Sequence, residues 1–70
     1  MDYVVIIEKG DKSFGAYVPD LPGGVAVGDS REEVMTLIRE AIEFHVAGHR
    51  EDGRPVPLPA SSIELVRVAA

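Results

Sequence analysis

The stretch Pro19-Asp20-Leu21-Pro22-Gly23-Gly24-Val25-Ala26-Val27-Gly28-Asp29-Ser30, with Glu33 three residues later, decides how this chain folds. The two prolines fix their own φ angles and restrict the residues before them, which predicts a stiff corner. The glycines let the backbone turn where a Cβ atom would clash. Ser30 and Glu33 have capping-box spacing, so a helix is predicted to begin there. The structural motif consists of Pro19, Asp20, Leu21, Pro22, Gly23, Gly28, Ser30 and Glu33.

Three short strands are predicted before this helix. Residues 3–8 are β-branched and aromatic, and a turn at 9–12 leads to a return strand at 13–18. Pro19 ends that strand because proline cannot donate to a sheet ladder. Residues 24–28 form the third strand. Residues 3–8 are apolar on both faces, so we expect a second copy or a partner to cover the face that the helix leaves open.

The helix is predicted over residues 31–48, with Gly48 as its stop. Its apolar arc spans roughly 200°, whereas a surface helix needs about 100°. The excess again indicates a second packing partner. The side chains expected on the wet face are Glu32, Glu33, Thr36, Arg39, Glu40, Glu43 and Ala47, and those on the apolar face are Val34, Met35, Leu37, Ile38, Ala41, Ile42, Phe44 and Val46.

A proline-rich loop at 50–59 and a last strand at 63–68 complete the predicted order β-β-β-α-β. The predicted fold class is α+β, with two layers: a mostly antiparallel sheet and one helix on a face. We expect residues 1–70 to form a single domain.

Size and charge restrict the function. A chain of 70 residues buries only about 60% of its unfolded surface. It has no cysteine for a disulfide, so self-association as a homodimer or homotetramer is expected. The net charge of −5 argues against nucleic-acid binding by this chain alone and suits a basic partner. No signal peptide or membrane span is apparent, so a cytoplasmic location is expected.

Few residues could carry catalysis. His45 and His49 share a helix face, but only Asp52 could complete a metal site, so partly buried or interface imidazoles are the simpler interpretation. Acidic side chains near the helix start favour the helix dipole. No serine lies in a nucleophile elbow, and Gly23 and Gly24 do not have phosphate-loop spacing. We therefore predict no catalytic, metal or cofactor site, and no enzyme.

Three carboxylates are candidates for contact with a partner. Asp20 could accept the amides that follow it in the corner, or it could contact a partner directly. Glu40 and Glu43 lie on the wet face of the predicted helix. The partner-binding residues are therefore predicted to be Asp20, Glu40 and Glu43.

The chain resembles the HicB-like antitoxin domain of bacterial type II toxin–antitoxin systems. The matching pieces are Tyr3-Val4-Val5-Ile6-Ile7-Glu8, Tyr17-Val18-Pro19-Asp20-Leu21-Pro22-Gly23, Gly28-Asp29-Ser30 with Glu33, Glu40-Ala41-Ile42-Glu43, and Glu51-Asp52-Gly53 leading to Pro57. They cover nearly the whole chain, in order.

This resemblance implies a partial ribonuclease H-like fold that binds and neutralises a small basic HicA-type mRNA-cleaving toxin by protein–protein contact. Complete family members usually continue into a DNA-binding segment, which this sequence lacks, so we expect no operator binding by this chain. The alternative is an orphan oligomeric structural or regulatory protein of the same fold, with no toxin partner.

Overall fold

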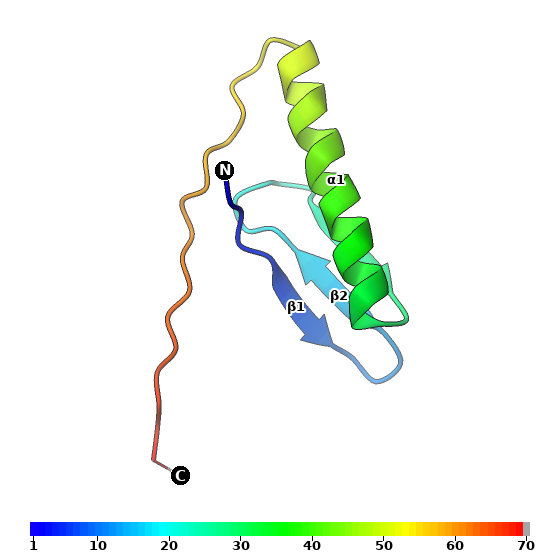
Figure 1. Cartoon of the computed structure of the whole chain (residues 1–70), viewed down its shortest axis with the longest axis vertical. Helices are drawn as coiled ribbons and strands as arrows, with labels where there is room; N and C mark the ends of the chain where they lie inside the picture. Colours follow the sequence, from blue (N-terminus) through cyan, green and yellow to red (C-terminus); the bar gives the residue numbers. More distant parts are fainter. Residues whose placement is uncertain (70) are drawn as a thin grey trace.

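A computed structural model describes residues 1–69. It contains three strands and one helix, in the order β1 (Ile6–Lys9), β2 (Phe14–Tyr17), β3 (Val25–Gly28) and α1 (Arg31–Glu51). The strands form one antiparallel sheet in the order β1-β2-β3. The helix covers one face of this sheet, which gives two layers (Figure 1). The α+β class is confirmed.

The proline corner consists of two successive turns between β2 and β3. The amide of Leu21 donates to the carbonyl of Val18, and the amide of Gly24 donates to the carbonyl of Leu21. Gly23 has a φ of 85°, which is the value that the third residue of a type II turn after proline requires. The corner also carries Leu21 into the core, where it is only 1% exposed. The motif thus shapes the backbone and supplies a core side chain.

The capping box forms as the sequence predicts. Ser30 is the N-cap, and its hydroxyl accepts from the amide of Glu33. The Glu33 carboxylate accepts in turn from the amide of Asp29. The first bond satisfies an amide that the first helical turn leaves free, and the second joins Glu33 to the residue before the N-cap.

The core lies between the sheet and the first half of the helix. Ile7 and Ala16 are paired across β1 and β2, and Ala16 is paired with Ala26 on β3. Since successive strand side chains alternate between faces, these three belong to the face under α1. The buried members of the core are Ala16, Val18, Leu21, Val34 and Ile38.

The predicted helix end at Gly48 is wrong. The helix continues to Glu51, Asp52 is the C-cap, and Gly53 follows with a φ of 67°. One glycine inside a helix costs about 1 kcal/mol relative to alanine. The other residues of the neighbouring turns can offset this cost. Gly53 adopts the left-handed conformation that ends helices, so the stop signal lies five residues later than predicted.

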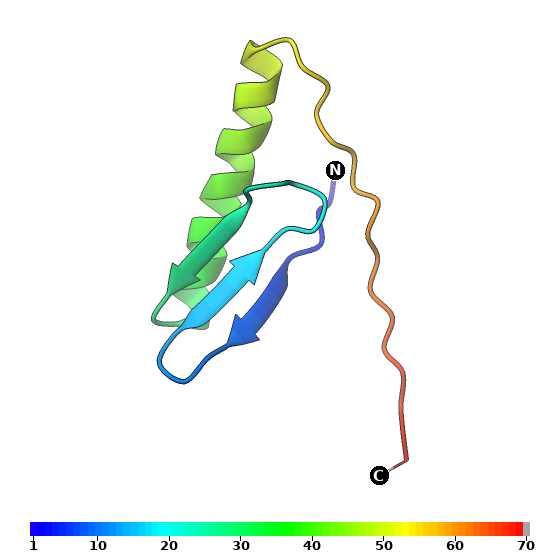
Figure 2. The same cartoon turned by 180° about the vertical axis from the view of Figure 1, so that it is seen from behind.

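The predicted last strand at 63–68 is also wrong. Residues 62–69 are exposed and belong to no strand within the described chain. We call residues 62–69 the arm. It leaves the end of the loop that follows α1 and runs away from the body of the molecule (Figures 1 and 2). An extended pattern needs a paired neighbour to become a strand, and the arm has none here.

No helix within residues 1–69 combines the length and apolar character that a bilayer crossing requires.

Candidate protein-binding surface

The exposed face of α1 carries the two predicted glutamates. Glu40 and Glu43 are exposed, and their three-residue spacing places them side by side on the helix. Within the described residues the one ion pair joins Arg54 and Asp52, so neither glutamate is neutralised by an ion pair. Such carboxylates remain available to a basic partner. All side chains predicted for the wet face are exposed, which confirms that part of the helix analysis.

Part of the predicted apolar arc also faces solvent. Val34 and Ile38 are buried, but Leu37 is 37% exposed and Phe44 is 81% exposed. Leu37 and Phe44 are seven residues apart, so they lie on one side of the helix. Glu40 lies between them in sequence and one turn from each. The helix therefore presents two apolar side chains next to the exposed carboxylates of Glu40 and Glu43. Apolar side chains bordered by polar ones are typical of protein-binding surfaces.

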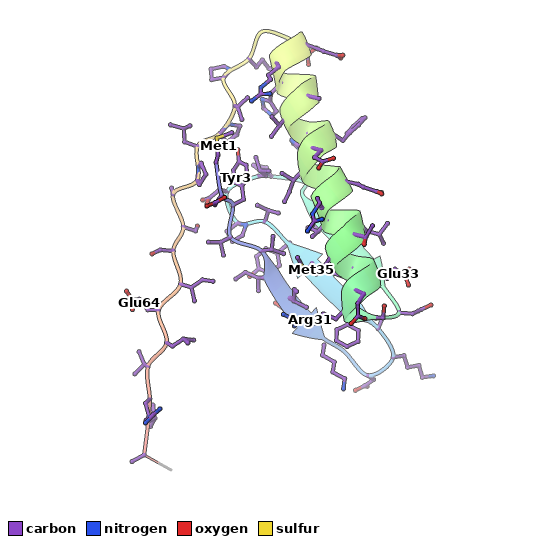
Figure 3. The ribbon with its side chains drawn as sticks, viewed as in Figure 1. Met1, Tyr3, Arg31, Glu33, Met35 and Glu64 are labelled. Carbon is purple, nitrogen blue, oxygen red and sulfur yellow. The ribbon has the colours of Figure 1, made fainter. Side chains whose placement is uncertain are left out.

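A groove lies between the start of the chain and the second half of α1. Its volume is about 410 Å³. Met1 and Tyr3 lie on the side of the groove towards the loop that follows the helix (Figure 3). Glu43 lines the same groove, so the groove adjoins the exposed glutamates Glu40 and Glu43. The complete lining consists of Met1, Tyr3, Ile42, Glu43, Val46, Ala47 and Arg50.

Sequence reasoning missed most of this groove. Ile42, Val46 and Arg50 follow one another at four-residue spacing, so a shared helix face was available from the sequence. The approach of Tyr3 is tertiary, because the tyrosine hydroxyl donates to the carbonyl of Pro57, 54 residues away in the chain. No local pattern predicts such a contact.

Asp20 holds the end of the loop that follows α1. One carboxylate oxygen accepts from the amides of Ala60 and Ser61, each at 3.0 Å, and the other accepts from the Ser61 hydroxyl at 3.0 Å. These bonds, led by the two backbone amides, lower the pKa of Asp20 below its usual 3.8. The carboxylate thus bonds to residues distant in sequence, whereas the turn interpretation expected the amides that follow it.

His45 and His49 stack on one another, with ring centroids 5.5 Å apart and planes at 24°. A Cβ atom on Gly23 would lie 3.4 Å from Nε2 of His45, so the proline corner packs closely against this ring. Nδ1 of His49 is buried without a hydrogen-bond partner. No cluster of three or more possible metal ligands exists within residues 1–69. His45 thus contributes to packing between α1 and the corner.

Comparison with known proteins decides the family. A family model described as HicB-like antitoxin of bacterial toxin–antitoxin systems matches residues 3–69. The chain belongs to the HicB-like antitoxin family. The resemblance found in the sequence is therefore confirmed over nearly the whole chain.

Individual relatives agree with this family. Antitoxin HicB 2 of Photorhabdus laumondii is 30% identical over 64 residues, which cover 91% of this chain and 46% of that protein. An uncharacterized 14.9 kDa protein of Haemophilus phage HP1 is 40% identical over 57 residues, covering 81% and 43%. A UPF0150 protein of Helicobacter pylori is 40% identical over 47 residues, covering 67% and 65%. The chain thus spans less than half the length of the first two. No solved structure gives a significant match.

Proposed function

We propose that this HicB-like chain is an antitoxin that binds a small basic HicA-type mRNA-cleaving toxin and blocks it by protein–protein contact. The observation that carries the proposal is the family match over residues 3–69. The name of the Photorhabdus relative, an antitoxin, supports the same role. The proposed role is binding without catalysis, in the cytoplasm, where messenger RNA is the toxin's substrate.

The acidic face of α1 is the proposed toxin-binding surface. Glu40 and Glu43 supply exposed negative charge, and the chain as a whole carries −5. Complementary charge accelerates the encounter with a basic protein and orients it. The same net charge repels nucleic acid, so the chain alone is proposed not to bind RNA or DNA.

Apolar contacts beside this charge would hold the complex. Interfaces draw most of their binding energy from a few large side chains that become buried, while charged residues surround them. Phe44, 81% exposed, is the proposed anchor on this chain. The groove beside Glu43 is proposed to receive an apolar side chain of the toxin.

Asp20 is proposed to act differently from the two glutamates. Its carboxylate accepts three hydrogen bonds from Ala60 and Ser61, so a partner could reach it only in competition with them. We propose that Asp20 supports binding indirectly, by fixing the position of residues 60–61.

A second candidate function is an orphan oligomeric regulator of the same fold. The observation that favours it is the apolar surface away from the helix, where Tyr17, Val25 and Val27 are 41%, 66% and 68% exposed. Such a surface suits self-association, which we propose in either case, as a homodimer or a homotetramer.

Co-expression with the neighbouring reading frames tests the proposal. A tagged chain should co-purify with a short basic protein, and expression of the chain should relieve the growth arrest that this protein causes alone. A variant carrying Glu40→Lys and Glu43→Lys should rescue growth less well, whereas Glu64→Lys, the same change on the arm, should rescue fully. Recovery of the chain without any basic partner would support the orphan regulator.

A further inference from the structure

The arm has a residue composition typical of a β-strand, but within the described residues it pairs with no other strand. Four of its side chains are apolar and largely exposed: Ile63 at 64%, Leu65 at 94%, Val66 at 82% and Val68 at 77%. Odd and even positions both contribute, so both faces of the extended arm are apolar. Within the described residues no hydrogen bond involves a backbone group of the arm. Its amides and carbonyls are therefore available to pair with another strand.

An unpaired strand edge lies on the same side of the molecule. β1 pairs with β2 alone, so within residues 1–69 its other edge meets no strand. Both views show the arm on the β1 side of the sheet, away from β3 (Figures 1 and 2). A free edge of this kind is a site where another extended segment can add.

The start of the arm is fixed. Asp20 holds Ala60 and Ser61 through three hydrogen bonds of 3.0 Å. The Tyr3 hydroxyl, three residues before β1, holds the carbonyl of Pro57. Beyond these anchors the arm turns away from its own β1, and Glu64 projects into solvent far from the sheet (Figure 3). The anchors thus present the arm outward.

The sheet face away from the helix is also uncovered. Ile6, Tyr17 and Val25 are directly paired across the three strands, so they form one row on this face. Tyr17 and Val25 are largely exposed, as is Val27 in the next row. An arm added to its own β1 within one chain would leave its side chains on this face in water, together with this row.

We propose that two copies of the chain exchange arms, each arm adding residues 63–68 as a strand to the free edge of β1 in the other copy. The second copy supplies an edge for the arm's backbone and apolar side chains for both of its faces. Reciprocal exchange closes at two chains, because each copy gives one arm and receives one. The predicted fourth strand then forms, but between chains.

The dimensions of the single chain agree with this. Its radius of gyration is 14.0 Å and its longest extent is 49 Å. A compact domain of this length has a radius of gyration of roughly 11 Å. The excess comes from the arm, which extends about 3.3 Å per residue and so reaches far enough to cross to a neighbour.

Sedimentation of the full chain and of arm variants tests the exchange. The full chain is expected to sediment as a dimer. A variant with Leu65→Pro and Val66→Pro loses two adjacent amides, which point to opposite edges of a strand, so the ladder fails in either register. Its dimer dissociation constant should rise at least about tenfold, which corresponds to about 1.4 kcal/mol. The matched control is Ala69→Pro, outside residues 63–68, which should leave the dimer unchanged.

Two results would overturn the exchange. A full chain that stays monomeric shows that the arm is free or folds onto its own β1. A dimer whose dissociation constant does not respond to the two prolines is held by another surface. Circular dichroism should show unchanged helix content in every variant, because the arm touches none of the core.

Cysteine cross-linking separates exchange from folding back. The chain has no cysteine, so an introduced pair gives an unambiguous product. One chain carries Glu8→Cys on β1, and another carries Glu64→Cys or Arg67→Cys, which lie on opposite faces of the arm. Mixing the two and oxidising should give a linked heterodimer, since a disulfide needs Cα atoms within about 7 Å. Failure of both arm positions to link, together with a disulfide inside one chain that carries both substitutions, would contradict the exchange.

This inference specifies the self-association part of the proposed function. Both measurements use the chain alone, so a negative result here leaves toxin binding to be judged separately.

Discussion

At the scale of single residues, the two contrasting glycines are Gly28 and Gly48. A Cβ atom on Gly28 would lie 3.1 Å from Cγ2 of Val34, a side chain that is fully buried. A Cβ atom on Gly48 would meet nothing within 4 Å. The first glycine lets β3 approach the helix closely, and the second only weakens the helix.

We therefore predict opposite effects of alanine at these two positions. Gly28→Ala should lower the free energy of unfolding by about 1–3 kcal/mol, because the new methyl group overpacks the core. Gly48→Ala should raise it by about 0.5–1 kcal/mol, because alanine is the better helix former. Urea unfolding followed by circular dichroism measures both. A stabilised Gly28→Ala variant would contradict the packing described for β3.

Asp20 gives the arm's anchor a pH dependence. The hydrogen bonds from Ser61 and Ala60 lower the pKa of Asp20 below 3.8. A group with a lowered pKa contributes its stabilisation above its unfolded value and loses it as the pH falls through the folded value. The anchor should therefore be intact at neutral pH and release only in acid, below the usual range of aspartate.

Amide signals of Ala60 and Ser61 in an NMR titration measure this release. In the unchanged chain both should shift together as Asp20 becomes protonated. In Asp20→Ala both should already have their released positions at neutral pH. Asp2→Ala, a change at an exposed aspartate near the chain start, is the control and should leave the titration as it was. If both amides keep the chemical shifts of the unchanged chain in Asp20→Ala, another contact holds residues 60–61.

At the scale of elements, local chemistry predicted most of what forms. The corner, the capping box and the three strands came from prolines, glycines and side-chain periodicity, and each forms within a few residues of its predicted limits. The helix end was misjudged because the sequence offers two glycines. Only Gly53 takes the left-handed conformation, after the C-cap at Asp52. An Asp-Gly pair after a basic last turn was the better stop signal.

The segment 63–68 shows where a sequence pattern stops being informative. Its β-branched residues favour extended backbone, and the segment runs as an extended trace (Figures 1 and 2). Pairing depends on an edge elsewhere, which no local pattern specifies. The groove beside Tyr3 was missed for the same reason, because it depends on a contact across 54 residues.

The exposed face of α1 leads to a prediction about charge. Glu40→Lys and Glu43→Lys should each weaken toxin binding by about tenfold at low salt, because a repulsive pair replaces an attractive one. The loss should shrink as ionic strength rises, because salt screens exposed charges. Titration calorimetry at two salt concentrations measures both effects. Glu8→Lys, the same charge change on β1, is the matched control. Equal losses for all three variants would mean that net charge alone matters.

At the scale of the whole molecule, the main prediction from composition concerned surfaces that a single chain leaves uncovered. The first strand and the helix both carried more apolar side chains than one helix and one small sheet can bury. The structure leaves Phe44, Val25 and Val27 largely exposed, and the arm with them. The excess of exposed apolar surface was thus predictable from the sequence. Which surface serves which partner was not, because that depends on how the faces are oriented in three dimensions.

The two proposals divide these surfaces. The acidic side of α1, with Phe44 and the groove, is assigned to the toxin. The edge of β1, the uncovered sheet face and the arm are assigned to a second copy. Because the surfaces differ, dimer formation and toxin binding should not compete.

Inhibition of RNA cleavage by the purified toxin is the direct test of the antitoxin role. The basic protein encoded beside this chain is mixed with messenger RNA and increasing amounts of the chain. Cleavage is expected to fall to zero near one chain per toxin, and the Glu40→Lys and Glu43→Lys double variant is expected to need a large excess to reach the same level. Undiminished cleavage at saturating chain, with the chain folded, would contradict the antitoxin role.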